Sequence, residues 1–146
     1  MGGLWMPGTR LSPELSRELR ATSKLVKKKK GAILFRAGGR ARGAFVVRSG
    51  RIRLQLEGAA GLYPPRILGA GAMVGLPATV SGEPYSLTAE VVQDCDLSFI
   101  PRKALLALLR RNTTAALKIL QILSEEIYQM RNTATLAIPV KRETVH

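Results

Sequence analysis

The chain has almost none of the side chains that enzymes use for nucleophilic or metal chemistry. It contains one cysteine, Cys95, and one histidine, the terminal His146. A single cysteine cannot form an internal disulfide or hold an iron–sulfur cluster, and one histidine gives little support for a zinc or haem site. The two aspartates that flank Cys95 would raise its thiol pKa, and no histidine lies beside it as a base. We therefore expect no enzymatic activity, no metal and no cofactor.

Long apolar runs are also missing. No run approaches the about 20 consecutive apolar residues that span a bilayer, and residues 1–8 lack the basic and apolar regions of a signal peptide. Without an export signal, the single cysteine favours a reducing cytoplasm. The content of 46% hydrophobic and 23% charged residues is typical of a soluble globular chain. We expect one domain over residues 11–136, with flexible termini at 1–10 and 137–146.

Acidic residues are scarce, because 10 Asp and Glu face 23 Lys and Arg and the net charge is +13. Such a charge favours a polyanionic partner. The cations are dispersed, however, except at Lys27–Lys30 and Arg110–Arg111, and solvated faces explain them equally well. Since neither a recognition helix nor an aromatic set for base stacking is evident, the sequence gives little support for nucleic-acid binding by this chain alone.

Short β-strands separated by glycine-containing turns make up the middle of the chain. A short amphipathic helix is expected before them, at Leu11–Thr22, and Ser49-Gly50 is expected to form a tight hairpin turn between two of the strands. Short strands with regular turn signals favour a sandwich or small barrel over a parallel α/β sheet. The expected strands are Leu25–Lys29, Ala32–Arg36, Ala44–Arg48, Arg51–Glu57, Arg66–Leu68, Met73–Val74, Ser86–Val92 and Asp96–Ile100.

Residues 69–91 form the stretch with the most distinctive pattern. Glycines at 69, 71 and 75 permit tight turns or close approach of another group. A short helical turn, with proline near its start, is expected at Leu76–Thr79, and a strand returns after the Gly82-Glu83-Pro84 turn. The N–H groups at the start of such a turn can receive an anion.

This arrangement resembles the phosphate-binding cassette of cyclic-nucleotide-binding domains, and in particular the sensor domain of the Crp/Fnr family of bacterial regulators. The frame is present as Gly75-Leu76-Pro77 and as residues 84–88. The resemblance implies an α+β, mainly β fold. Its centre is a β-roll (a double-stranded β-helix or jelly roll), with a short N-terminal helix and a long C-terminal dimerisation helix. It also places turn glycines at 31, 43 and 50.

The two residues that define a cyclic-nucleotide site in that family are different here. Leu76 stands where the ribose-binding glutamate would be, and Tyr85 stands where the phosphate-pairing arginine would be. A tyrosine hydroxyl cannot replace the charge-assisted, bidentate hydrogen bonds of arginine. We therefore expect a less charged and more apolar pocket between the roll and the long helix. The residues expected to line it are Gly75, Leu76, Pro77, Ala78, Tyr85, Ser86, Thr88 and Arg131.

From Pro101 onward the apolar period becomes helical. A short helix is expected to end near Asn112, and Thr113 or Thr114 is expected to cap a second helix that reaches about Thr135. Ile119 and Ile122 are expected to pack on the roll. The second helix also carries a seam of nearly three heptads, which predicts a homodimer through residues 113–135. The seam residues are Ala116, Leu120, Leu123, Ile127, Met130 and Ala134.

Three functions remain open from the sequence. The first is a ligand-sensing regulatory domain of a Crp/Fnr-type transcription regulator that binds a small molecule other than cyclic AMP. The second is a ligand-free dimerisation or protein-interaction module with a relic pocket, in which Tyr85 is packed inward. The third is cyclic AMP or cyclic GMP binding by a different geometry. DNA is an expected partner only if a C-terminal helix-turn-helix domain follows Leu136 in a longer protein, because none is present before His146.

Overall fold

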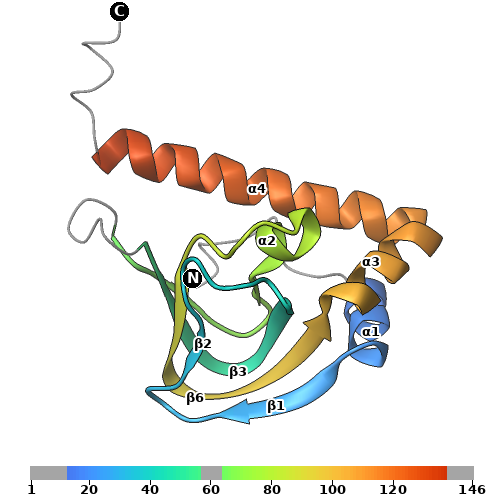
Figure 1. Cartoon of the computed structure of the whole chain (residues 1–146), viewed down its shortest axis with the longest axis horizontal. Coiled ribbons are helices and arrows are strands. Elements are labelled where there is room, and N and C mark those ends of the chain that lie inside the picture. The colour runs from blue at the N-terminus through green and yellow to red at the C-terminus, as the bar shows by residue number, and fades with distance from the viewer. Residues whose placement is uncertain (1–12, 57–63, 138–146) are drawn as a thin grey trace, which may run out of the picture.

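The computed structural model describes residues 13–56 and 64–137, and it describes the side chains of the last helix as far as Tyr128, Glu126 excepted (Figure 1). The termini that we expected to be flexible, 1–10 and 137–146, therefore lie outside the described residues except for Ala137. Leu11 and Glu57, which end two of the expected elements, also lie outside them. The elements follow in the order α1 (Pro13–Ala21), β1 (Lys24–Lys28), β2 (Ile33–Phe35), β3 (Gly43–Gln55), β4 (Arg66–Leu68), β5 (Met73–Val74), α2 (Leu76–Ser81), β6 (Thr88–Pro101), α3 (Arg102–Arg111) and α4 (Thr113–Ala137).

The strands form one antiparallel sheet that is rolled around an apolar interior, as the expected β-roll requires. The long strands β3 and β6 pair along most of their length. The main path through the sheet is β1-β6-β3-β4, while β2 also pairs with β6 and β5 with β3. The predicted fold class is thus confirmed, and most short strands lie within a residue or two of their expected ranges.

The expected hairpin at Ser49-Gly50 is wrong, because residues 43–55 form one continuous strand. The register against β6 shifts around Ser49 and Arg51, so the two residues form a bulge rather than a turn. Gly50 has a φ of 94°, and a Cβ there would collide with the backbone of Asp94. Glycine at position 50 does indicate an unusual backbone conformation, but glycine is typical of bulges as well as of turns.

The final two expected strands are likewise one strand, β6. The break that the sequence predicted between residues 92 and 96 is only an irregularity in the ladder with β3. Cys95 is buried in the middle of this strand and pairs with Lys28 of β1. The sheet is therefore built on two long bent strands, and their inner faces define the interior of the roll.

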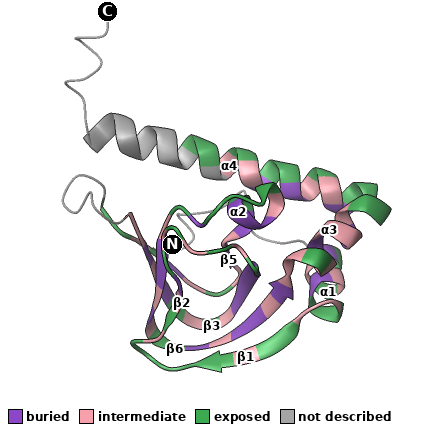
Figure 2. Cartoon of the chain, viewed as in Figure 1, coloured by how far each residue is buried: buried purple, intermediate pink, exposed green. Residues whose placement is uncertain are grey.

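Two apolar clusters hold the domain together. We call the first the roll core, because its members come mainly from the inner faces of β3 and β6. We call the second the helix-side core, because α1, α3 and α4 contribute to it (Figures 1 and 2). Representative members of the roll core are Phe35, Phe45, Val47, Ile52, Leu54, Tyr85, Val91 and Leu97. Representative members of the helix-side core are Leu15, Leu19, Met73, Leu76, Leu105, Leu108, Ile119 and Ile122.

Helix α4 packs on the domain mainly by one stripe. Ile119 and Ile122 are buried in the helix-side core, as predicted. Leu120 and Ile127 of the expected seam are each 58% exposed. The side chains of Met130 and Ala134 lie outside the described set. Ala116 and Leu123 of the seam are half-buried, and Leu123 packs against the helix-side core. Of the described seam residues, Leu120 and Ile127 are therefore the ones that face away from the chain's own core.

The start of α4 is capped by Asn112 rather than by Thr113 or Thr114. The N–H of Ala115 donates to Asn112 Oδ1 at 2.9 Å. The backbone carbonyl of Asn112 accepts a hydrogen bond from the N–H of Ala116 at 3.0 Å. Asparagine is as good an N-cap as serine or threonine, so the prediction was wrong only in its register. Among the described helices, none combines the length and apolar character needed to span a bilayer.

Candidate functional site

The expected cassette forms a short helix that starts from a left-handed glycine. Gly75 has a φ of 81°, and α2 begins at the next residue with proline in its first turn. The hydroxyl of Thr79 donates to Gly75 O at 2.7 Å, and the Thr79 N–H donates to the same oxygen at 3.2 Å. These bonds close the first turn of α2. The predicted frame of glycine, proline and helical turn is therefore present.

Leu76 does not face a ligand space. Its side chain is fully buried in the helix-side core, beside residues of α3 and α4. A leucine there contributes apolar packing, whereas the carboxylate that the family pattern calls for would need charged or polar partners. Leu76 thus packs as a structural residue in this chain, and its predicted place in a ligand site stays a prediction.

Tyr85 is fixed by its backbone, its ring and its hydroxyl group. Its N–H donates to Gly39 O at 3.0 Å and its carbonyl accepts from Gly38 N at 2.7 Å. Its hydroxyl donates to Gly43 O at 2.6 Å and accepts from the Gly43 N–H at 3.3 Å. The ring stacks on Phe35 with centroids 3.9 Å apart. The side chain therefore points inward and has no hydroxyl hydrogen left for another acceptor.

Gly75 lies directly against this aromatic pair. A Cβ at Gly75 would be 3.1 Å from the ring of Tyr85 and 3.2 Å from that of Phe35. The absence of a side chain at Gly75 thus lets the start of α2 rest on the two rings. The cassette and the inner aromatic side chains form one packed unit.

The remaining predicted site residues do not form one polar cluster. Pro77 and Ser86 are exposed and Ala78 is buried in the roll core. The hydroxyl of Thr88 accepts from the Ala37 N–H at 2.9 Å, so it ties β6 to the loop after β2. Arg131 is in α4, and its side chain lies outside the described set. Of the predicted hydroxyl groups, those of Tyr85 and Thr88 therefore serve contacts within the domain.

The carboxylates near the cassette differ in their surroundings. Glu83 is exposed. Glu90 is half-buried and pairs with Arg53 at 2.6 Å. Neither arrangement provides two facing acids in a cleft.

Cys95 has the properties expected of an unreactive thiol. Burial raises its pKa most, a backbone hydrogen bond with Arg51 lowers it, and the negative charges of Asp94 and Asp96 raise it further. Its Sγ donates to Gln93 O at 3.2 Å. The predicted direction of the shift is confirmed, although burial rather than the aspartates is its largest cause.

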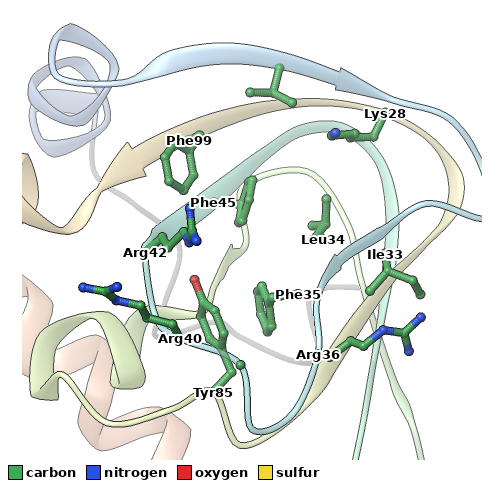
Figure 3. Close-up of a pocket in the computed structure, with 12 residues that line it drawn as sticks. Lys28, Ile33, Leu34, Phe35, Arg36, Arg40, Arg42, Phe45, Tyr85 and Phe99 are labelled. Carbon is green, nitrogen blue, oxygen red and sulfur yellow. The ribbon is translucent and has the colours of Figure 1, made fainter.

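A hollow of about 430 Å³ opens beside Tyr85, and we call it the aromatic hollow (Figure 3). Sequence reasoning missed it. The signal was present, because the chain has only three phenylalanines and all three lie at inward positions of separate strands. The lining residues are Val26, Lys28, Ile33, Leu34, Phe35, Arg36, Gly39, Arg40, Arg42, Phe45, Tyr85 and Phe99.

A second, larger and strongly basic hollow adjoins the first. It has a volume of about 1030 Å³ and shares Arg40 and Arg42 with the aromatic hollow. On its other side lie Arg102, Lys103 and Arg110 of α3. No acidic side chain is among its lining residues. The dispersed charge of the sequence is thus locally concentrated here, on one flank of the roll.

Comparison with known proteins gives one family and many similar folds. The sequence model described as "Cyclic nucleotide-binding domain" matches residues 25–112, which is more than half of the chain. No curated protein sequence matches the chain.

Several solved structures share the fold over most of this chain. The catabolite activator protein of Thermus thermophilus has a TM-score of 0.73 and 24% identity, over 86% of this chain and 60% of that one. The N-terminal domain of a transcriptional regulator from Streptomyces coelicolor has a TM-score of 0.66 and 20% identity, over 88% of this chain and 94% of that one. The sensor domain of the transcriptional regulator DNR from Pseudomonas aeruginosa has a TM-score of 0.63 and 29% identity, over 82% of this chain and 79% of that one. The chain thus spans about 60% of the Thermus protein and most of the two isolated domains.

Proposed function

The chain belongs to the cyclic nucleotide-binding domain family, and we propose that it is a ligand-sensing regulatory domain whose effector is neither cyclic AMP nor cyclic GMP. The regulator would be of the Crp/Fnr type, because the structural neighbours include the N-terminal domain of one transcriptional regulator and the sensor domain of another. Control of transcription itself would need a DNA-binding domain such as a helix-turn-helix, so that part of the proposal concerns a longer protein.

The position of Tyr85 is the observation that carries the proposal. Where the family pattern has a phosphate-pairing arginine, this chain has a buried phenol whose hydroxyl is already bonded to both backbone groups of Gly43. A cyclic phosphate brought to this place would find no guanidinium there, and it would lose hydration without a charge-assisted partner from this position. At the position where the family pattern has a ribose-binding carboxylate, this chain has Leu76, which is buried in the helix-side core and offers no charged group to a ribose.

Isothermal titration calorimetry with cyclic AMP and cyclic GMP tests this proposal. We expect no saturable heat at micromolar concentrations, whereas micromolar binding would correspond to about 8 kcal/mol. Titration with 5′-AMP at the same salt concentration is the control for non-specific attraction of anions to a protein of net charge +13. A Kd in the micromolar range for either cyclic nucleotide, with no binding of 5′-AMP, would overturn the proposal and support a different binding geometry.

The ligand-free module remains a second candidate, because Tyr85 is packed inward as that reading requires. The presence of a hollow beside the same side chain favours the sensor instead. Native mass spectrometry of the protein as purified separates the two. A bound small molecule that is released on denaturation supports the sensor. Repeated absence, together with no stabilisation by any member of a metabolite library, supports the interaction module.

Dimerisation through α4 forms part of both candidate functions. Leu120 and Ile127 are large apolar side chains more than half exposed, and they lie on the seam that the heptad spacing defines. Ile119 and Ile122 already attach the helix to its own domain. A second copy of α4 would bury the remaining stripe, and a ligand-dependent shift of the helix would then change the relation between the two subunits.

A further inference from the structure

Most of the aromatic side chains that the structure describes lie in one place. Aromatic residues make up only 5% of the sequence, yet all three phenylalanines and one of the three tyrosines line the aromatic hollow. They come from β2, β3, β6 and the segment before β6. Alternation along a strand explains why each ring points inward, but it does not require all four rings to border the same space.

The rings surround an opening rather than closing it. Phe35 stacks on Tyr85 at 3.9 Å, whereas Phe45 lies 6.3 Å from Phe35 and 5.0 Å from Phe99. Figure 3 shows these four rings standing around a common space. The volume of about 430 Å³ lies within the range of small-molecule pockets in proteins. Planar apolar groups are the natural occupants of a space with ring faces and edges on several sides.

The mouth of the hollow carries only positive charge. Lys28, Arg36, Arg40 and Arg42 are all exposed lining residues, and no acidic residue lines the hollow. The ion pairs that the described residues form use other cations. In Figure 3, Arg42 and Lys28 extend toward the rings, while Arg36 and Arg40 point outward. The hydroxyl of Tyr85 is already bonded to Gly43, so polar recognition must come from the cationic rim.

We propose that the aromatic hollow is a binding site for a small planar aromatic anion, such as an aryl carboxylate. Its ring system would lie among Phe35, Phe45, Phe99 and Tyr85, and its carboxylate would face Arg42 and Lys28. The lining residues thus supply aromatic rings for apolar contact and a guanidinium for a charge-assisted hydrogen bond. The adjoining basic hollow, with Arg102, Lys103 and Arg110 of α3, adds to the positive potential at the mouth.

This site differs from the one between the cassette and the long helix. Of the eight residues that the sequence assigned to a ligand, only Tyr85 lines the aromatic hollow. The proposal therefore stands independently of whether cyclic nucleotides bind, and the two calorimetric experiments can fail separately.

Calorimetric titration with naphthalene-2-carboxylate tests the chemistry of the site. We expect saturable one-site binding with a Kd of about 1 mM or tighter, as usual for a ligand of this size. The matched probe is 2-naphthylmethylammonium, which has the same rings and the opposite charge. It should bind at least about tenfold more weakly, because it would face the cationic rim. Equal affinity for the two probes, or no binding of the carboxylate, would overturn the proposal.

Two pairs of substitutions locate the site. Lys28→Gln with Arg42→Gln should weaken carboxylate binding by about tenfold, since two exposed charge contacts are lost. Lys24→Gln with Arg51→Gln is the matched control. It removes the same charge from exposed positions on β1 and β3 that do not line the hollow, and it should leave the affinity unchanged. An equal loss in both double variants would show only non-specific attraction, which contradicts the proposal.

A third variant tests the aromatic part without changing the charge. Val26 is half-buried on β1 and lines the hollow. Val26→Trp should place an indole in the space and abolish carboxylate binding while circular dichroism shows the same β content. Retention of wild-type affinity by this folded variant would place the probe elsewhere and refute the assignment.

Discussion

Replacing Tyr85 by phenylalanine should destabilise the fold, because the hydroxyl of Tyr85 is buried and makes two hydrogen bonds to Gly43. The stronger bond is the donation to Gly43 O at 2.6 Å, and the weaker one is the acceptance from Gly43 N at 3.3 Å. Phenylalanine would keep the ring and its 3.9 Å stacking on Phe35. The substitution thus isolates the hydroxyl group from the packing of the side chain.

The expected loss is about 2 kcal/mol. A typical buried hydrogen bond contributes about 1 kcal/mol, and polar groups left without a partner add a desolvation cost of about 1–3 kcal/mol. The 3.3 Å bond lies near the long end of hydrogen-bond geometry, so it should contribute little to the total. For a chain of 146 residues, this loss corresponds to a Tm decrease of about 6 °C.

Urea denaturation of wild type and variant measures the difference directly, since the midpoint should fall while the m-value stays constant. Tyr128→Phe is the matched control, because it removes the same hydroxyl from a side chain that is 61% exposed. It should change the free energy of unfolding by less than about 0.5 kcal/mol. If the two variants have the same midpoint, Tyr85 is not held by Gly43, and the proposed reason why cyclic nucleotides do not bind is refuted.

Three further substitutions test other parts of the structure. Leu76→Glu should lower the free energy of unfolding by about 3 kcal/mol or more, because it buries a carboxylate in an apolar cluster, whereas Leu76→Met should cost less than about 1.5 kcal/mol. Thermal denaturation compares the two, and equal costs would contradict the burial of Leu76. Ile127→Glu should convert the proposed dimer into a monomer in sedimentation equilibrium, while the equally exposed but off-seam Tyr128→Glu should not; a dimer that survives Ile127→Glu would exclude this interface. The raised pKa of Cys95 means that the unfolded chain loses its thiol proton at a lower pH than the folded protein does. Stability should therefore fall as the pH rises above about 8.5, and Cys95→Ala should remove that part of the decline in denaturation curves. An identical pH dependence in the variant would show that Cys95 does not contribute.

The fold could be predicted because its signals are local and repeated. Three signals depend only on neighbouring residues. They are the glycines between short apolar strands, the change to a helical apolar period after Pro101, and the separate apolar stripes of the last helix that contain Ile119 and Leu120. The prediction failed at Ser49-Gly50, where the choice between a turn and a bulge depends on a partner strand far away in the sequence. Gly50 lies against Asp94 of β6, and no pattern near residue 50 reveals that contact.

The candidate site was less predictable because it depends on side-chain directions across the roll. The frame from Gly75 to Pro77 was recognisable, yet Leu76 turns toward the helices and Tyr85 toward the roll core. The sequence could indicate that the charges of a cyclic-nucleotide site are missing. It could not indicate what replaced them, because the contact between Tyr85 and Gly43 joins residues 42 positions apart.

Tyr85 links the aromatic hollow to the cassette, so occupation of one should affect the other. Its ring lines the hollow, while Gly75 at the start of α2 packs on the same ring and on Phe35. A molecule that shifted Tyr85 would break its bonds to Gly43 at the start of β3 and remove the support beneath α2. Leu76, the first residue of α2, lies in the same core as Ile119 and Ile122 of α4. A ligand in the hollow can therefore bias the position of the long helix only if its affinity differs between two positions of Tyr85.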